Sequence, residues 1–493
     1  MKATVLLQEL FPNQPIPSIE IQSVTESSVA SNSHAVFVCI CGTKADGHTY
    51  AADAYRRGCR VFVAQKPLEL PSDALVLISS NTRKTLAILA CKLYGDPSRR
   101  MRLIGVTGTK GKTTTAHLLT HLLNRAGIPC GYIGTNGITY KNTHMPSKNT
   151  TPDSVTLQKT LCDMQNADVH TAVIEVSSQA LLQCRVDGTA FDTVLFTNLF
   201  PDHIGPNEHP NFENYKACKH RLFTDFEAKH AIYNADDAAA FDMLQGTSAS
   251  HLVSCSAFAN ADYTALDITP FRNKKHLGVS FTMQSEKGSR SCILPLTGSM
   301  NVYNALLAVA TAIEVFGVDL SIAVQALSDA TVSGRSELIP LPNGACAVID
   351  YAHNGESLAK LLSTLREYAP NRLIVLFGSI GERAQMRRGE LGSVAASLSD
   401  LAILTSDNPA NEPPEAIIAD IAQAFEFSKT PYLSIPDRTE AIRYALLACR
   451  ADDILVLAGK GHENYQLIGN QKIPFSERAI IAETVREIVH VSS

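Results

Sequence analysis

Short runs of apolar residues recur along most of the chain, separated by segments whose apolar residues follow helical spacing. The runs lie at 35–40, 60–64, 103–106, 171–176, 193–197, 231–234, 346–350, 373–377, 401–405 and 454–458. Helical segments are expected at 48–57, 112–126, 298–313, 356–368 and 414–425. Buried strands that alternate with helices in this way predict mostly parallel sheets covered on both faces, and therefore an α/β fold.

The breaks in this pattern predict three domains. Residues 1–97 form a small N-terminal α/β domain that ends in a Gly-Asp-Pro-Ser turn. Residues 98–333 form a central domain like that of P-loop ATPases, with a mostly parallel sheet to which 277–283 adds an antiparallel strand. Residues 334–493 form a C-terminal, Rossmann-like α/β domain.

Composition narrows the class of protein. With 45% hydrophobic residues, 18% charged residues and a formal net charge of −5, the chain resembles ordinary soluble globular proteins, and no nucleic-acid partner is expected. Glu9 and Pro12 interrupt the apolar start, so no signal peptide is expected. The apolar stretches are too short to span a bilayer, so no membrane insertion is expected. The 12 cysteines include no Cys-x-x-Cys pair, which favours free thiols in a reducing cytoplasm. We expect a monomer.

The segment MRLIGVTGTKGKTTT, at 101–115, carries the strongest chemical signal. An apolar strand runs into a turn from Gly108 to Gly111, and a helix begins near Lys112 and Thr113. Glycines let backbone N–H groups close around phosphate oxygens, and the helix N-terminus adds positive potential. Lys112 would reach the β- and γ-phosphates, and the Thr113 hydroxyl would bind Mg²⁺. A glycine-rich turn with a solvated lysine is the alternative.

Polar residues also follow two other buried strands of the central domain. Glu175 ends one strand, and Asp202 and His203 come just after the next. A carboxylate at a strand's carboxyl end beside a phosphate loop can hold Mg²⁺ directly or through water, and His203 is a candidate second ligand. The alternatives are a helix cap or an ion pair for Glu175 and, for Lys219 further on, a solvated helix lysine.

Three loops of the C-terminal domain carry charged residues directly after predicted parallel strands. They contribute Arg383, Asp407 and the group Lys460, His462 and Glu463. Because parallel strands end at one edge of their sheet, these residues are expected together, where open α/β sheets bind ligands.

With these motifs in this order, the chain resembles the Mur ligase family over essentially its whole length, and within it the tripeptide synthetases. GTKGKTTT resembles the family's ATP loop, where Asn is more usual than Lys110. NTTPD, at 149–153, and EVSS, continuing to Gln183 and Arg185, resemble the segments that hold the muramoyl-dipeptide. Gln179 stands where the family usually has His, so no histidine role is carried over.

The resemblance implies the site residues. Those for ATP are Gly108, Thr109, Lys110, Gly111, Lys112, Thr113, Thr114, Asn301, Asn304, Arg335, Asp350 and His353. Those for the UDP-linked substrate are Ser27, Thr43, Lys44, Ala45, Asn149, Thr150, Thr151, Ser177, Gln183 and Arg185. Those for the incoming amino acid are Arg383, Asp407, Asn408, Ala410, Gly459 and Glu463. The implied catalytic residues are Lys112, Glu175, His203 and Lys219, and the Mg²⁺ ligands are Thr113, Glu175, His203 and a carbamoylated Lys219.

The implied reaction is ATP-dependent amide formation in peptidoglycan precursor synthesis. The γ-phosphoryl group passes to the D-glutamate carboxylate of UDP-MurNAc-L-Ala-D-Glu, and the amine of an amino acid attacks the acyl phosphate. Relatives that add meso-diaminopimelate typically carry Asp-Asn-Pro-Arg, whose arginine pairs with the second carboxylate. Here Ala410 ends that motif, which favours L-lysine. Diaminopimelate stays the alternative, because AGKGHE is common in relatives that add it and because Arg383 or a nearby lysine could replace the missing arginine.

Two other functions stay open. Folylpolyglutamate and cyanophycin-type ligases share the phosphate loop and the lysine, although NTTPD followed by EVSS favours the muramyl branch. A non-catalytic nucleotide-binding regulator would explain the departures at Lys110, at Gln179 and at Glu26, where the family usually has the Asp of an Asp-Ser-Arg motif. The retained Lys112 and Lys219 argue against that alternative.

Overall fold

The computed structural model describes residues 1–42, 45–205, 208–273, 276–334, 337–382 and 385–491, with side chains through residue 488. Thr43, Lys44, Arg335 and Arg383, which the resemblance implies as contacts, lie outside the described residues. Contacts along the backbone divide the chain into two compact units. The first holds residues 1–264, 284–288 and 303–323, and the second holds 265–283, 289–302 and 324–493. The three domain boundaries stay a prediction.

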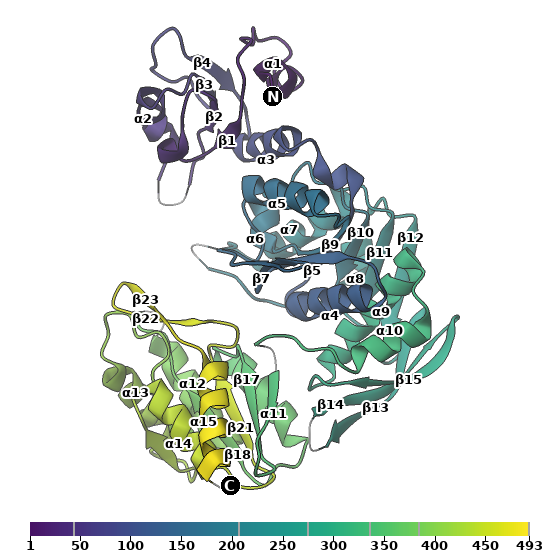
Figure 1. The fold of residues 1–493 in the computed structure, drawn as a ribbon, viewed down its shortest axis with the longest axis vertical. Helices are drawn as coiled ribbons and strands as arrows, with labels where there is room; N and C mark the ends of the chain where they lie inside the picture. Colours follow the sequence, from purple (N-terminus) through teal and green to yellow (C-terminus); the bar gives the residue numbers. More distant parts are fainter. Residues whose placement is uncertain (43–44, 206–207, 274–275, 335–336, 383–384, 492–493) are drawn as a thin grey trace. The chain divides into compact units, whose positions relative to one another are not determined.

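The N-terminal residues form a four-stranded parallel sheet in the order β1-β2-β3-β4 (Figure 1). Its elements are β1 (Ser23–Thr25), β2 (Ala35–Val38), β3 (Val61–Ala64), β4 (Leu75–Ile78), α1 (Ala3–Leu7), α2 (Ala51–Arg56) and α3 (Thr82–Leu93). The strands predicted at 35–40 and 60–64 are found as β2 and β3. The helix predicted at 48–57 begins as a 3₁₀ turn over Gly47–Tyr50, because the Asp46 carboxylate caps the His48 amide.

The central sheet has eleven strands in the order β15-β14-β13-β12-β11-β10-β5-β9-β6-β7-β8. The strands are β5 (Arg102–Thr107), β6 (Cys130–Gly134), β7 (Gly137–Tyr140), β8 (Thr143–Met145), β9 (Thr171–Glu175), β10 (Thr193–Phe196), β11 (His230–Asn234), β12 (His251–Ser256), β13 (Tyr263–Arg272), β14 (Leu277–Ser285) and β15 (Gly288–Leu294). From β12 to β6 they pair in parallel, as predicted, whereas β7 and β8 are antiparallel.

Helices follow the central strands. They are α4 (Lys112–Arg125), α5 (Ser154–Asn166), α6 (Ser178–Leu182), α7 (Phe212–Thr224), α8 (Ala240–Leu244), α9 (Met300–Phe316) and α10 (Leu320–Leu327). Helix α4 buries the predicted apolar face, namely Leu118, Leu119, Leu122 and Leu123, and the chain turns at Gly127 with a φ of 79°.

The C-terminal sheet has six strands in the order β16-β17-β21-β18-β19-β20. The strands are β16 (Glu337–Pro340), β17 (Cys346–Asp350), β18 (Leu373–Phe377), β19 (Leu401–Leu404), β20 (Tyr432–Ser434) and β21 (Ile454–Ala458). Its helices are α11 (Gly355–Arg366), α12 (Gln385–Leu398), α13 (Pro414–Ala422), α14 (Arg438–Ala448) and α15 (Glu477–Val491), and β22 (Tyr465–Ile468) pairs with β23 (Gln471–Pro474). Strand β16 is antiparallel to β17, and the other five strands run in parallel.

Both faces of the C-terminal sheet are buried. Val348, Val375 and Val456 pack into a core with apolar residues of α11, α12 and α13. Their strand neighbours Ile374 and Leu455 pack on the other face with residues of α14 and α15, which Figure 1 shows lying together. Because successive strand residues face opposite sides, a sheet covered twice needs unbroken apolar strands. The α/β architecture predicted from the apolar runs is confirmed.

Two properties bear on the surroundings of the protein. Among the residues described, the helices fall short of the length and hydrophobicity that a bilayer crossing requires. In the same residues the cysteines are free thiols, and most of them are buried in the packed interior, as Cys91 and Cys346 are.

Candidate active site

The loop between β5 and α4 forms a cradle that only glycine can build. Gly108 and Gly111 have φ angles of 148° and 87°, a range that favours glycine. A Cβ added to Gly108 would lie 1.9 Å from the Oγ1 of Thr197, and one added to Gly111 would lie 2.4 Å from the Oδ1 of Asn304. The loop leads directly into α4, with Gly111 at the N-terminal cap, where the helix dipole favours an anion.

Residues just after β10 hold this loop from the side. The carbonyl of Asn198 accepts the Thr109 amide at 2.8 Å, and its Oδ1 accepts the Lys110 amide at 2.9 Å. The Thr197 hydroxyl donates to the Lys110 carbonyl at 2.6 Å. Sequence reasoning assigned no role to Thr197 or Asn198. The available signal was their place at the carboxyl end of a strand that pairs with β5.

Two lysines converge on the carbonyl of Gly108. The Nζ of Lys112 donates to this oxygen at 2.9 Å and to the Thr109 carbonyl at 3.1 Å. The Nζ of Lys219, on α7, donates to the Gly108 oxygen at 2.7 Å, and its side chain is buried. Burial, with the charge of Lys112 as the second cause, holds the pKa of Lys219 well below its usual range. Lys219 is therefore not a solvated helix lysine.

Glu175 lies at the end of β9, with no exposed surface. Its Oε1 accepts the Tyr132 hydroxyl at 2.5 Å and the Thr135 amide at 2.9 Å, and its Oε2 accepts the Thr113 hydroxyl at 2.9 Å. A Cβ on Gly134 would lie 2.2 Å from Oε1. The predicted pair Thr113 and Glu175 is thus brought together. Tyr132 and Thr135, which sequence reasoning missed, fix the orientation of the carboxylate.

Asp202 and His203 lie in the segment between β10 and α7. The Oδ2 of Asp202 accepts the Nζ of Lys110 at 2.9 Å. Burial opposes ionisation of this carboxyl, but the hydrogen bond and charge of Lys110 bring its pKa below the usual range. His203, with a φ of 57°, has its Nδ1 2.9 Å from the Oε1 of Glu208 and is half-exposed. Among the described residues, no cluster of three or more His, Cys, Asp or Glu is assembled as a metal site.

The residues implied for the muramoyl-dipeptide lie next to Glu175. The Thr151 hydroxyl donates to the Glu175 carbonyl at 2.7 Å and accepts the Ser177 amide at 3.0 Å. Arg185 donates to the Thr151 carbonyl at 3.0 Å and to the Oε1 of Gln183 at 2.7 Å. Burial lowers the pKa of Arg185.

The same segment contacts Thr135, a partner of the Glu175 carboxylate, and also reaches the surface. Thr150 shares a hydrogen bond of 3.1 Å with the Oγ1 of Thr135, and Asn149 is exposed. Of the N-terminal residues implied for UDP, the Ser27 amide donates to the Oγ1 of Thr25 at 3.0 Å, and the Ala45 carbonyl accepts the Gly42 amide at 2.9 Å.

The remaining residues implied for ATP fall in both compact units. Asn304 lies in the first unit, where its Oδ1 accepts the Thr115 hydroxyl at 3.1 Å. Asn301 belongs to the second and donates to the Thr297 carbonyl at 2.8 Å. Also in the second unit, the Oδ1 of Asp350 accepts the Ala352 amide at 2.9 Å. The Nδ1 of His353 lies 2.9 Å from the Tyr351 carbonyl oxygen.

The residues implied for the incoming amino acid surround a buried lysine. The Nζ of Lys460 donates to Asp407 at 3.2 Å, to Asn408 at 2.9 Å and to Glu463 at 3.2 Å. Gly459, with a φ of 111°, lies so close that a Cβ would be 2.8 Å from the Asp407 carboxylate. The structure therefore brings together Asp407, Asn408, Gly459 and Glu463 around Lys460, which the sequence placed at the same sheet edge without a role.

Ala410 lies in a strained loop beside the β22–β23 hairpin. Its φ is 52°, its amide donates to the Leu467 carbonyl at 3.0 Å, and its carbonyl accepts the Gly469 amide at 2.7 Å. The methyl group of Ala410 supplies no charge for a carboxylate, as the sequence indicated.

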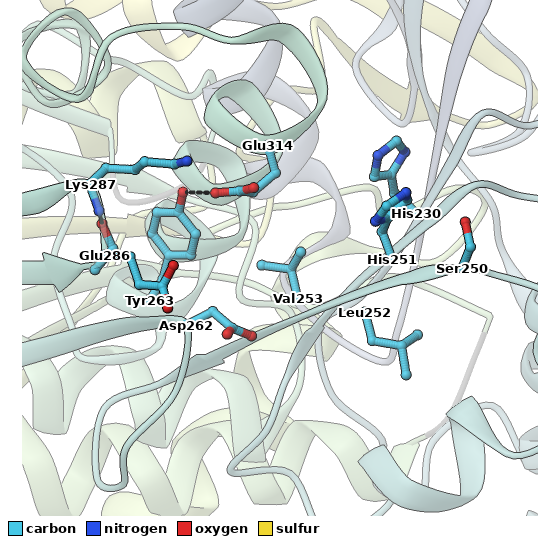
Figure 2. Close-up of a pocket in the computed structure, with 11 residues that line it drawn as sticks. His230, Ser250, His251, Leu252, Val253, Asp262, Tyr263, Glu286, Lys287 and Glu314 are labelled. Atoms are coloured by element: carbon cyan, nitrogen blue, oxygen red, sulfur yellow. Dashed lines mark hydrogen bonds between the residues drawn. The ribbon is translucent and has the colours of Figure 1, made fainter.

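A separate pocket of about 480 Å³ opens at the amino ends of β11 and β12 (Figure 2). His230 and His251, the first residues and register partners of these strands, stack with ring centroids 4.9 Å apart. Across the pocket the Tyr263 hydroxyl donates to Glu314 at 2.6 Å. The phosphate loop follows the carboxyl end of β5, so this pocket lies at the opposite edge of the sheet and contains none of the predicted site residues.

Comparisons with known proteins show the family to which the chain belongs. Residues 106–312 match the family model of the Mur ligase middle domain, and residues 334–461 match that of the Mur ligase glutamate ligase domain. The chain is 36% identical to the UDP-N-acetylmuramoyl-L-alanyl-D-glutamate–2,6-diaminopimelate ligase of Bacillus velezensis, over 99% of both chains. It is 36% identical to the ligase of that name from Clostridium botulinum, over 95% of this chain and 96% of the relative.

Solved structures agree with the fold. A structure of a ligase of that name is 29% identical, with a TM-score of 0.73 over 99% of this chain and 100% of that one. A folylpolyglutamate synthase of Mycobacterium tuberculosis is 17% identical, with a TM-score of 0.59 over 77% of this chain and 92% of that one, and this likeness concerns the fold alone.

Proposed function

Because this chain belongs to the Mur ligase family, we propose that it joins meso-diaminopimelate to the D-glutamate of UDP-MurNAc-L-Ala-D-Glu at the expense of ATP. It is an ATP-dependent ligase that forms an amide between an acid and an amino acid, in cell-wall synthesis. The observation that carries the substrate proposal is the 36% identity, along 99% of the chain, to a ligase named for these two substrates. The free, mostly buried cysteines fit a reducing compartment, and we propose a cytoplasmic site of action.

The sequence and the relatives disagree on which amino acid the enzyme adds. The alanine at 410 favoured L-lysine, but that preference has no support among the relatives compared, which are named for 2,6-diaminopimelate. A second carboxylate still needs a cation in place of the missing arginine. Lys472 is our candidate. It is exposed, and in the β22–β23 hairpin it pairs with Leu467, whose carbonyl accepts the Ala410 amide.

The glycine cradle and the groups around it support the ATP proposal. We propose that the loop amides and Lys112 bind the phosphates. Lys112 now donates hydrogen bonds to two loop carbonyls, and it can donate to phosphate oxygens instead. The Thr113 hydroxyl and the Glu175 carboxylate are oxygen donors of the kind that Mg²⁺ takes, and they fit that ion. When bound, Mg²⁺ neutralises charge on the transferred phosphoryl group. Catalysis then rests on positioning and charge stabilisation by these residues.

We also propose that Lys219 works as a carbamate. Lowering the pKa of an amine favours its unprotonated form, and this form attacks carbon dioxide. The new N–C bond forms with loss of one proton from nitrogen, so a buried amine becomes an anion with two oxygens beside the phosphate loop. Protein labelled with ¹³C-bicarbonate is expected to show a carbamate ¹³C signal that is lost in Lys219→Met. Equal signals in the two proteins would refute the proposal.

The function is tested by incubating the purified protein with ATP, UDP-MurNAc-L-Ala-D-Glu and a panel of amino acids. We expect phosphate release and a new UDP-linked product with meso-diaminopimelate, and much less with L-lysine. In Lys472→Met the KM for diaminopimelate is expected to rise with little change for L-lysine. Efficient use of L-lysine alone would overturn the choice of amino acid. A protein that turns over no ATP with any member of the panel would instead be the nucleotide-binding regulator.

A further inference from the structure

Phe258 is a large apolar side chain in an unusual place. It follows the carboxyl end of β12, and 88% of its surface is exposed. Single exposed apolar residues are common on protein surfaces, so exposure alone carries no argument. The carboxyl edge of an open α/β sheet, however, is where such folds bind their ligands, and the phosphate loop follows β5 at the same edge.

The loop that presents Phe258 is held rigidly. The Asp236 carboxylate accepts the Ser256 hydroxyl at 2.6 Å and the Ala257 amide at 2.7 Å. The Ser256 oxygen in turn accepts the Phe258 amide at 3.0 Å. Burial opposes ionisation of Asp236, but these donors bring its pKa below the usual range, which agrees with a tightly bound carboxylate. The aromatic ring therefore projects from a fixed turn, so little conformational freedom is lost when it binds a partner.

A series of hydrogen bonds connects this turn to the phosphate loop through the ends of the strands. The Thr197 hydroxyl, after β10, donates to the Lys110 carbonyl of the loop. The Nδ2 of Asn234, which ends β11, donates to the Thr197 carbonyl at 2.9 Å. Asp236 follows two residues later. The four strands β5, β10, β11 and β12 are neighbours in the sheet, so about 14 Å separates the first from the last.

Helix α9 makes a second connection between the same two places. The Oδ1 of Asn304 accepts the hydroxyl of Thr115, in the helix that follows the phosphate loop. The adjacent Tyr303 donates its hydroxyl to Asp236 at 2.8 Å. One turn of α9 thus contacts both the phosphate cradle and the carboxylate that holds the Phe258 turn.

We propose that Phe258 is the side chain on which the base of the bound nucleotide stacks. The proposal rests on the ATP site proposed above and adds the recognition of the base. A nucleotide whose phosphates lie in the Gly108–Gly111 cradle can extend along the strand ends, over β10 and β11, to the exposed ring. Stacking on an aromatic face suits any base, so the contact supplies affinity more than choice among purines.

The test compares Phe258→Ala with the wild-type protein in calorimetric titrations with ATP, ADP and inorganic tripolyphosphate. Loss of one base–aromatic stack is expected to weaken ATP and ADP binding about 5- to 150-fold. Tripolyphosphate has no base, so its affinity should stay unchanged. Phe258→Tyr should bind ATP like the wild type. Phe241→Ala is the matched control, because Phe241 lies on α8 of the same unit with 78% of its surface exposed.

Each other outcome has a definite meaning. If Phe258→Ala binds ATP as tightly as the wild type and Phe241→Ala do, the stacking proposal is overturned and the ATP site stands. If Phe258→Ala weakens tripolyphosphate as much as ATP, the substitution acts on the phosphate loop, and stacking is again overturned. If the wild-type protein binds neither ATP nor tripolyphosphate, the proposed function itself fails, and the base contact with it.

Discussion

Lys460→Met should destabilise the C-terminal sheet strongly. In the wild type the ammonium group lies buried among Asp407, Asn408 and Glu463, at 2.9–3.2 Å from their oxygens. Methionine keeps most of the side-chain volume but removes the charge and the donors. Asp407 and Glu463, with side chains 4% and 16% exposed, would then be carboxylates without their cation in a poorly solvated site.

The magnitude follows from this burial. Removing one partner of a buried ion pair costs about 3–5 kcal/mol, because the other charge stays buried and unpaired. In a domain of this size each kcal/mol lowers the melting temperature by roughly 2–4 °C, so a decrease of roughly 6–20 °C is expected. Adding Glu463→Gln to Lys460→Met should recover part of the loss, since one of the two unpaired charges is then gone.

The measurement is urea unfolding and calorimetric melting of the full chain. Lys429→Met is the control, because Lys429 is exposed and the same substitution there should change stability by less than about 0.5 kcal/mol. If Lys460→Met were as stable as this control, the buried charge cluster would not contribute as argued. A double variant no more stable than Lys460→Met would show that Glu463 is not the unpaired partner.

Three further predictions concern the phosphate loop, acid stability and the amino acid. If Lys112 neutralises the transferred phosphoryl group as proposed, Lys112→Ala should lower the rate of phosphate release on the order of 10³-fold, and near-normal turnover would refute the phosphate-loop assignment. Arg388 and the Glu382 amide lower the pKa of Glu412 to about 2 in the folded protein. The stabilisation from Glu412 is therefore present above its unfolded pKa, near 4.5, and is lost as pH falls from there towards 2. Glu412→Gln should flatten the pH dependence of urea unfolding over that interval, and an unchanged slope would contradict the prediction. Ala410→Arg should lower the KM for diaminopimelate several-fold, with no extra backbone strain because alanine already holds the left-handed φ, and an unchanged KM would show that residue 410 does not face the second carboxylate.

The parts predicted well are those in which a short stretch of chain determines the geometry. The phosphate cradle is contiguous in sequence, and buried parallel strands such as β18 and β21 are apolar at every position. Strands with mixed signals were missed, among them β6, which contains two glycines, and the short, half-exposed β20. Their pairing depends on neighbours that are distant in the sequence.

The side-chain partners were harder to foresee. The resemblance implied Asp407 and Glu463 as contacts of the incoming amino acid. In the structure an internal lysine occupies them, because the direction of each side chain depends on tertiary packing. Tyr132, in β6, and Thr135, in the turn after that strand, reach Glu175 from a segment with no local motif. The preference for lysine rested on the single position 410, which full-length similarity outweighs.

Because two lysines share the Gly108 carbonyl, nucleotide binding is expected to change the number of protons bound to the protein. Lys112 and Lys219 both donate to this one oxygen, and the charge of Lys112 is, after burial, the second cause of the lowered pKa of Lys219. A triphosphate that neutralises Lys112 removes that part of the field, so an unmodified Lys219 then takes up protons from the buffer. A carbamoylated Lys219 has no such amine left to titrate. Calorimetric heats of ATP binding in buffers of different ionisation enthalpy therefore give the number of protons taken up. That number in turn gives the fraction of the enzyme in which Lys219 is carbamoylated.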